Sequence, residues 1–313
     1  MLDAASKTFF HLVAQSRTLK KMASRYGMRR PASFARRFIA GETVEEAIAA
    51  ARAASARGVL ITLDLLGESV TNLDEATTAT REYLDVVEAV IASDVERNLS
   101  LKLTQLGLDV DKATAIDNIR KILERAEPAG FFVRIDMEGS AYTDVTLEIF
   151  ETLWRHGYRQ IGVVLQAALY RTEERDLARV NALGARIRLV KGAYREPKSI
   201  AHQQKADVDA AYARMMRTLI TDGHYAALAT HDPRMIELAR QWALEHGVAS
   251  DRFEFQMLFG VRRDLQAMLV RAGYRVRVYI PFGREWFPYF MRRLGERPAN
   301  AFFILRSIFG ESG

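Results

Sequence analysis

A cluster of arginines lies next to aromatic residues near the C-terminus, in the segment YFMRRLGERPAN at residues 289–300. Arg292, Arg293 and Glu296 follow Tyr289 by three, four and seven positions, which places all four broadly on one side of an α-helix. Adjacent arginines on a helix point about 100° apart. Two such guanidinium groups can grip one small carboxylate from two directions, while Glu296 holds Arg292 from one turn away. The alternative is an exposed helix with weak internal ion pairs, so the surrounding elements must decide.

Other polar residues lie where apolar runs of the chain end. Each of them alone has a plain explanation, such as a helix cap or a local ion pair. Parallel strands of a barrel, however, present their carboxyl ends on one face, so side chains from eight such ends line one pocket. This convergence favours a binding or catalytic site. The residues are Asp64, Glu68, Lys102, Asp136, Glu138, Gln166, Arg188, Lys191, Tyr194, Thr230, His231, Asp232, Gln256 and Tyr279.

Several kinds of chemistry lack their usual motifs. The six histidines form neither an H-x-H nor an H-E-x-x-H pattern, so we expect no metal site. A nucleophilic serine would be expected in a G-x-S-x-G turn, and none is present. A Schiff-base mechanism stays open, because Lys102 and Lys191 both lie on predicted strands, where burial could lower their pKa. The plainer interpretation is that each lysine binds an anionic group.

The elements that must position these residues alternate regularly from residue 58 onward. Short apolar, β-branched runs are followed by stretches in which apolar residues recur every three or four positions, the pattern of amphipathic helices. Eight strand–helix units over roughly 250 residues predict an α/β fold, a (β/α)8 TIM-type barrel. An open doubly wound sheet is the alternative, but no GxGxxG turn follows the first run. The runs are 58–67, 99–107, 131–139, 160–167, 185–194, 225–232, 252–260 and 275–283.

The N-terminal part of the chain differs from this repeat. Residues 1–57 contain the helical pattern TVEEAIAAARAASARG, so we expect an N-terminal helical arm, followed by a barrel at 58–313. Residues 17–37 carry many cations and no acid, within a chain of 45 Lys and Arg against 39 Asp and Glu. A solvated pair of helices is the favoured interpretation, and docking on anionic lipid or nucleic acid is the alternative.

Composition limits the remaining possibilities. The chain has 313 residues, 49% of them hydrophobic and 27% charged, which suits a globular protein with a sizeable core. It has no cysteine, which excludes disulfides and thiolate metal sites. No run reaches the roughly 18 apolar residues of a spanning helix, so any membrane contact is expected to be peripheral.

Nine motifs in this order resemble the proline dehydrogenase flavoenzymes, over about residues 58 to 300. They are DLLGE, LKLTQLG, RIDMEG, VVLQAAL, RLVKGAY, ATHD, FEFQML, VYIPFG and YFMRRLGERP. The last, with its R-R-x-x-E-R-P core, is the most specific. The chain is similar to the short monofunctional form, because neither an aldehyde dehydrogenase nor a DNA-binding segment fits in 313 residues.

The resemblance implies a distorted barrel that holds FAD non-covalently and oxidises L-proline to 1-pyrroline-5-carboxylate by hydride transfer to the flavin. Catalysis would rest on Lys102, Asp136, Tyr279, Arg292 and Arg293. The substrate would be bound by Lys102, Tyr279, Tyr289, Leu258, Arg292, Arg293, Glu296 and Glu68. Glu68 would pair with Arg292 as a gate when substrate is absent. The cofactor would be held by Gln166, Arg188, Val190, Lys191, Gly192, Ala193, Tyr194, Thr230 and His231.

The resemblance also implies partners and a location. Electrons would pass to a membrane quinone in the first step of proline catabolism, with no metal and no nucleic acid involved. A cytoplasmic protein with peripheral contact to the inner membrane would fit that acceptor. Two other functions stay open at this point: a Schiff-base lyase or aldolase that uses Lys102 or Lys191, and a basic protein that binds membrane or nucleic acid through residues 17–37.

Overall fold

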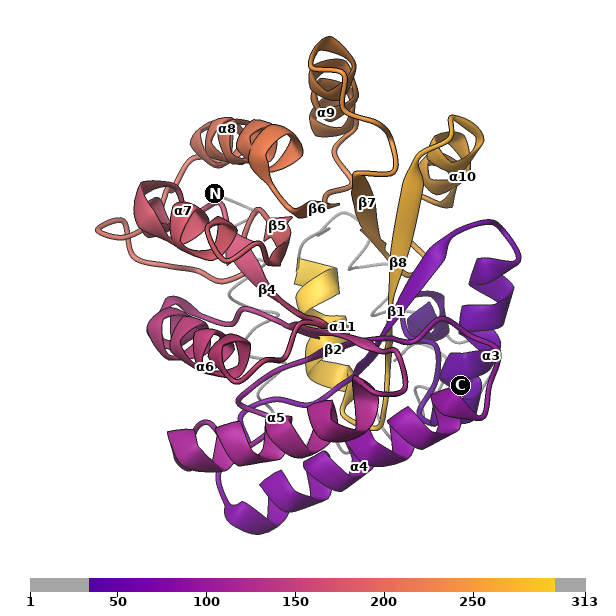
Figure 1. The fold of residues 1–313 in the computed structure, drawn as a ribbon. Helices are drawn as coiled ribbons and strands as arrows, with labels where there is room; N and C mark the ends of the chain where they lie inside the picture. The colour runs from indigo at the N-terminus through magenta and orange to yellow at the C-terminus, as the bar shows by residue number, and fades with distance from the viewer. Residues whose placement is uncertain (1–33, 296–313) are drawn as a thin grey trace, which may run out of the picture.

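The structure, a computed structural model, describes residues 34–295. Eight parallel strands form a closed barrel in chain order, with helices arranged around it (Figure 1). The predicted (β/α)8 TIM-type barrel is therefore confirmed. The strands are β1 (Leu60–Leu65), β2 (Asn98–Leu101), β3 (Phe132–Ile135), β4 (Ile161–Gln166), β5 (Arg186–Val190), β6 (Tyr225–Ala229), β7 (Phe253–Leu258) and β8 (Arg275–Phe282).

The strands are shorter than the apolar runs that predicted them, mainly at their carboxyl ends. The run at 99–107 continues six residues beyond the end of β2 at Leu101, and the run at 131–139 continues four beyond the end of β3 at Ile135. Most of these following residues stay buried although they have left the strand ladder, and only Asp136 and Gly139 are half-buried. The apolar pattern therefore continues past the strands because these residues are buried. Lys102 and Glu138 are polar residues of these buried segments, and they lie in the mouth of the barrel.

Several of the helices begin where the sequence supplies a capping side chain. Thr43 and Glu46 form a capping box before α3, Asn72 caps α4, and Asp111 caps α5. The helices are α3 (Val44–Ser55), α4 (Leu73–Ile91), α5 (Lys112–Ala126), α6 (Thr143–Arg155), α7 (Leu177–Asn181), α8 (Lys205–Asp222), α9 (Pro233–Glu245), α10 (Arg263–Arg271) and α11 (Trp286–Gly295). Shorter helical turns are η1 (Phe34–Arg37), η2 (Ser140–Tyr142) and η3 (Thr172–Asp176).

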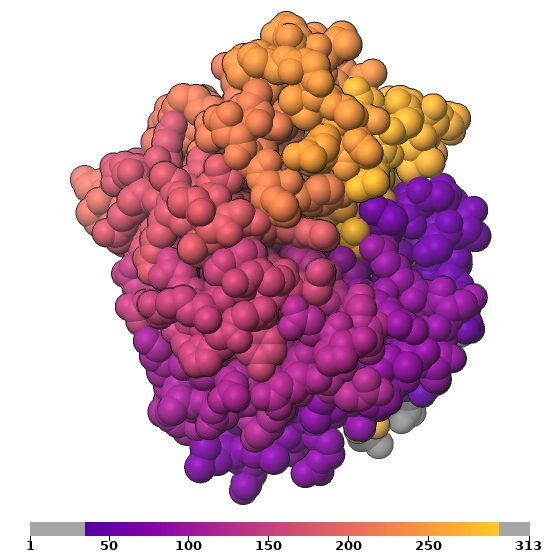
Figure 2. Space-filling view, in the orientation of Figure 1, coloured from indigo at the N-terminus to yellow at the C-terminus, as the bar shows by residue number. Residues whose placement is uncertain are grey.

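Helix α11 departs from the outer ring. It lies across the end of the barrel, inside the ring that the other helices form (Figure 1). In the same orientation, the space-filling view shows the centre of the ring closed by side chains, with α11 largely hidden behind them (Figure 2). The face of the barrel that is turned toward the viewer is therefore filled by side chains. Because Arg292 of α11 contacts Glu68 just beyond β1, α11 covers the end where the strands have their carboxyl termini.

The segment before β1 packs on the barrel. Ala47, Ala51 and Ala54 of α3 are fully buried, and α3 contacts both β1 and β8. Ahead of α3, the N–H group of Ala40 donates to Pro281 of β8. The predicted boundary between residues 57 and 58 stays a prediction. Of the basic stretch at 17–37, only η1 lies within the described residues. Within residues 34–295, no helix combines the length and the apolar character needed to cross a bilayer.

A charged network fills the opposite end of the barrel interior. Arg277 on β8 binds both carboxylate oxygens of Glu254 on β7, at 2.8 and 3.1 Å, and Glu96 at 2.7 Å. Both Arg277 and Glu254 are buried. Burial acts to raise the pKa of Glu254, but Arg277 outweighs it and the pKa is lowered. Glu254 is therefore ionised, and its loss would leave a buried cation short of a partner.

Glu254→Gln is accordingly expected to lower the unfolding free energy by about 3 kcal/mol, the usual cost of breaking a buried ion pair. Urea denaturation at neutral pH would measure it. Glu124→Gln is the matched control, because Glu124 makes an exposed pair with Arg120 whose loss costs less than about 1 kcal/mol. Equal and small effects of the two substitutions would contradict the role assigned to the network.

Candidate active site

Strands β1 and β2 bring a buried ion pair into the barrel mouth. The Lys102 Nζ lies 3.5 Å from Oδ1 of Asp64, whose side chain is completely buried. The registers explain the meeting, because Asp64 on β1 pairs with Ser100 on β2, two residues before Lys102. Burial acts to lower the pKa of Lys102, yet Asp64, Asp136 and Glu68 together raise it. Lys102 is thus held as a cation.

The Asp136 side chain links residues of two other strands, β8 and β5, across the mouth. Its Oδ2 accepts from the Tyr279 hydroxyl at 2.9 Å, and its Oδ1 accepts from Arg188 Nη1 at 2.7 Å. Arg188 also donates to the Ser100 hydroxyl at 3.0 Å, and its guanidinium lies over the Tyr279 ring at 5.3 Å. Burial, reinforced by Asp136 and Asp64, raises the pKa of Tyr279 far above its usual range, so its phenol stays protonated and can donate.

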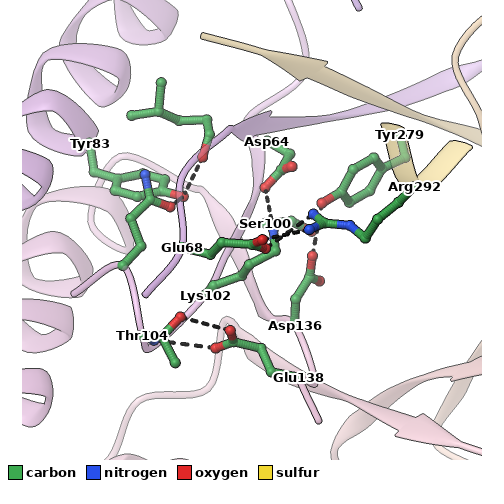
Figure 3. Close-up of polar contacts among 12 residues, drawn as sticks. Asp64, Glu68, Tyr83, Ser100, Lys102, Thr104, Asp136, Glu138, Tyr279 and Arg292 are labelled. Carbon is green, nitrogen blue, oxygen red and sulfur yellow. Dashed lines mark hydrogen bonds and ion pairs between the residues drawn. The ribbon is translucent and has the colours of Figure 1, made fainter. Parts of the chain in front are cut away.

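Arg292 on α11 makes a two-pronged ion pair with Glu68 from the loop after β1 (Figure 3). Its Nη1 and Nη2 lie 2.5 and 3.1 Å from the two carboxylate oxygens. Both side chains are partly buried, and Lys102 lies beside them. A small pocket opens at this pair, and it is lined by Leu66, Gly67, Glu68, Lys102, Glu285, Pro288, Tyr289 and Arg292. The contact that the sequence predicted between Glu68 and Arg292 is therefore present.

Three residues proposed to enclose a small ring lie around this centre. Leu258 ends β7 directly opposite Tyr279 in the register of β7 and β8. Tyr289 is buried on α11 and borders the pocket, and the Arg293 guanidinium lies over its ring at 5.3 Å. Glu296, the fourth member of the predicted helix face, lies outside the described residues.

The proposed cofactor residues occupy the ends of β4, β5 and β6. Gln166 is paired with Val190 in the register, and its amide nitrogen donates to the Glu138 carbonyl at 2.9 Å. Thr230 and His231 follow β6, and the His231 Nε2 accepts from the Leu258 N–H at 2.9 Å. The accepting nitrogen carries no proton, so the proton of the neutral ring is on Nδ1.

Lys191 and Gly192 begin the long loop after β5. Lys191 binds Asp209 and Asp232 at 2.5 and 3.1 Å. Gly192 has φ +115°, and an added Cβ would lie 3.1 Å from Ala168, so this backbone passes close to the neighbouring strand end. Gly192 and Ala193 are exposed toward the mouth side of the barrel. Lys191, the Gly192 backbone and the buried Thr230 after β6 are groups of a kind that can hold an anionic ligand.

Tyr194 lies nearer to the substrate residues than to the other proposed cofactor residues. The charged groups around its phenol are Glu138, Lys102, Glu68 and Arg292. Burial, followed by Glu138, raises the pKa of Tyr194 to about 12. The Tyr194 phenol is thus surrounded by the charged groups of the pocket at Arg292, and its predicted role in binding the cofactor stays a prediction.

The environments of the two lysines disfavour Schiff-base chemistry. A Schiff-base lysine must become neutral to attack a carbonyl, and such lysines have a lowered pKa. The surrounding carboxylates raise the pKa of Lys102 instead. Lys191 is held between two carboxylates. Among residues 34–295, no group of three or more His, Asp or Glu side chains is arranged to hold a metal ion.

Sequence reasoning missed several residues that organise the site. Ser100 lies two residues before Lys102, so the two-residue period of a strand could have placed both side chains on the same face. Asp64 is among the residues predicted to line the mouth, but its pairing with Lys102 was not foreseen, although a charge in the apolar run ITLDLL needs a partner. Thr104 had no comparable signal. Its N–H and hydroxyl donate to the two carboxylate oxygens of Glu138, at 3.2 and 2.7 Å.

Burial raises the pKa of Glu138 from an ordinary 4.5 to about 7. Between these values the folded chain binds more protons than the unfolded chain, so this contribution to stability is lost as pH rises through 7. Glu138→Gln cannot titrate. The unfolding free energy of the wild type relative to this variant should therefore fall by about 1.4 kcal/mol per pH unit between roughly 5 and 7, and level off above. Urea denaturation at several pH values would measure both unfolding free energies. If the two free energies changed in parallel with pH, the raised pKa of Glu138 would be contradicted.

Comparison with known proteins identifies the family. A profile of the family described as "Proline dehydrogenase" matches residues 47–306. Proline dehydrogenase 2 of Bacillus subtilis (strain 168) is 41% identical over 303 residues, 97% of this chain and 98% of that protein. Proline dehydrogenase of Deinococcus radiodurans is 42% identical over 280 residues, 88% of this chain and 90% of that protein.

A solved structure gives the same result. Proline utilization A (PutA) from Bdellovibrio bacteriovorus, inactivated by N-propargylglycine, has a TM-score of 0.78 and 26% sequence identity. The match covers 89% of this chain and 34% of that larger one. With these matches over nearly its whole length, the chain belongs to the proline dehydrogenase family of oxidoreductases that act on proline.

Proposed function

We propose that this chain oxidises L-proline to 1-pyrroline-5-carboxylate with a non-covalently bound FAD. The observation that carries the proposal is the two-pronged hold of Arg292 on the Glu68 carboxylate, in a pocket that Lys102 and Tyr289 also line. A guanidinium that binds one carboxylate in this way can bind the carboxylate of an amino acid. The family membership makes proline that amino acid.

Each part of proline has a partner of matching chemistry. Arg292, Arg293 and the cationic Lys102 would take the carboxylate, and Tyr279, Tyr289 and Leu258 would enclose the apolar ring. Cations near the substrate nitrogen favour its neutral amine, the form from which a hydride can leave. Arg188 and Tyr279 hold the Asp136 carboxylate in place. Asp136 would form the side of the pocket next to the reacting carbon and keep Arg188 and Tyr279 in position there.

The residues at the ends of β4, β5 and β6 fit the cofactor. Lys191, the backbone at Gly192 and Ala193, and the Thr230 hydroxyl would hold its anionic part, and Gln166, Arg188, Val190 and His231 would border the flavin ring. FAD would supply a two-electron acceptor for the hydride that leaves the ring carbon next to nitrogen; the substrate would become a protonated iminium, which gives the imine product when its nitrogen releases a proton to solvent. The protein supplies position and electrostatics for that step.

We propose that Glu68 is a gate. In the resting chain it neutralises Arg292, which would otherwise be a costly unpaired charge in a partly closed pocket. The carboxylate of proline competes for the same guanidinium. When proline binds, Glu68 is displaced and its loop is free to rearrange.

Electrons would then pass to a quinone in the membrane, and the chain would act in the cytoplasm at the inner membrane surface. The basic residues of 17–33 lie outside the described residues, so docking of that segment stays a prediction. Its test is co-sedimentation with vesicles, which must require anionic lipid and weaken with salt.

The proposed activity predicts a colour change. The purified chain should carry FAD and be yellow, and anaerobic L-proline should bleach its visible absorbance. Addition of a soluble quinone analogue should restore the colour. Pyrrolidine is the control, because it has the ring of proline without the carboxylate and should reduce the flavin far more slowly. A colourless protein, or a flavin that proline leaves oxidised, would contradict the proposed function.

The carboxylate clamp predicts a specific loss of discrimination. Arg292→Ala removes a charge-assisted hydrogen bond worth about 1.5–3 kcal/mol, so kcat/KM for proline should fall by roughly 10- to 100-fold. Turnover of pyrrolidine should change little, since it has no carboxylate to lose. Arg284→Ala, which removes an exposed cation just before α11, is the matched control. Equal losses for both substrates in Arg292→Ala would show that the arginine does not recognise the carboxylate.

A further inference from the structure

The loop that carries Glu68 is held from one side by the turn after β2. The Ser69 N–H donates to the Thr104 hydroxyl at 3.0 Å, and the Val70 N–H donates to the Thr104 carbonyl at 3.0 Å. Gly67 packs against Gln105, the residue after Thr104, so closely that an added Cβ on Gly67 would lie 2.4 Å from the Gln105 amide nitrogen. The backbone on both sides of Glu68 therefore rests on residues 104–105.

Thr104 is itself held in place by hydrogen bonds to Glu138. The carboxylate accepts from the Thr104 N–H at 3.2 Å and from its hydroxyl at 2.7 Å. Thr104 is completely buried and Glu138 is nearly so. A threonine hydroxyl can donate only one hydrogen bond, and here it donates that bond to Glu138. The remaining lone pairs of the oxygen are thereby turned toward Ser69, so the carboxylate fixes the direction of the contact that holds the loop.

Ser69 needs such a contact because its backbone is strained. Its φ is +57°, in the left-handed region that residues other than glycine seldom adopt. Without an external restraint the chain would relax to a conformation with negative φ, and the neighbouring side chain would move. The Thr104 hydroxyl supplies that restraint one residue away from the carboxylate that pairs with Arg292.

We propose that Thr104 and Glu138 are positioning residues that hold Glu68 against Arg292 and so set how readily the arginine is released to a substrate carboxylate. Neither residue touches the Arg292 guanidinium in the described contacts, and both act through the loop backbone. The proposal concerns the gate and rests on the proposed function. Its structural part, the anchoring of the loop, can be tested without any substrate.

Hydrogen–deuterium exchange of the purified chain tests the anchor. Thr104→Val keeps the side-chain shape and removes the hydroxyl, so the amides of residues 66–70 should exchange about fivefold faster or more, the effect of one lost hydrogen bond. Thr104→Ser keeps the hydroxyl and should exchange like the wild type. Thr62→Val is the matched control, because the buried Thr62 hydroxyl on β1 has no hydrogen-bond partner among residues 34–295. Unchanged exchange at 66–70 in Thr104→Val overturns the proposal.

Anaerobic stopped-flow reduction by proline tests the link to the gate. If Glu68 competes with the substrate, Glu68→Ala lowers the apparent Kd for proline, and Thr104→Val lowers it in the same direction by about two- to fivefold. In the double variant, Thr104→Val should add nothing to Glu68→Ala, since its effect passes through that carboxylate. Additive effects, or a raised Kd in Thr104→Val, overturn the proposal. Failure of proline to reduce the flavin in the wild type would instead refute the proposed function, and the exchange result would still decide the anchor.

Discussion

Closure of the barrel between β1 and β8 is the constraint on which the site depends. The two strands pair in parallel over the full length of β1, so the loop after β1 and the helix after β8 emerge side by side. Glu68 and Arg292 are 224 residues apart in the chain and meet only because of that closure. The segment before α3 strengthens the seam, since Ala40 bonds to Pro281 and Gly283 bonds to Gly41. Any change that loosens β1 from β8 would therefore reach the pocket directly.

The second requirement is that charges buried in the mouth neutralise one another. Lys102 has Asp64, Asp136 and Glu68 around it, and Asp136 also holds Arg188. Each group fixes the charge of the next, and removal of one would leave a partner desolvated and unpaired. This arrangement keeps Lys102 cationic and Tyr279 protonated. The proposed hydride transfer would require fixed charges and a fixed geometry, and a mutually paired cluster provides both.

The sequence predicted the barrel and the start of each strand to within two residues, because burial and alternation leave a pattern along the chain. Lys102, Asp136 and Tyr279 could be placed in one mouth for that reason. The pattern says nothing about which polar groups meet across the barrel, since Arg188 and Ser100 are 88 residues apart. It also overextended β2 and β3, whose following residues are buried without being in strands. Thr104 escaped notice because its importance lies in contacts to Glu138 and Ser69, which only the folded chain brings together.

In the proposed gate, Arg292 would serve two carboxylates in turn, and this would explain why several weak contacts converge on one loop. If Glu68 were fixed rigidly, proline could not displace it, and if the loop were free, Arg292 would lose its resting partner. A strained Ser69 held by one buried hydroxyl lies between these extremes. The strain favours release and the hydrogen bond opposes it, and both effects are on the order of 1–3 kcal/mol, so they offset one another. In the proposed gate, such a balance would let a substrate with only one carboxylate and a small ring shift the loop.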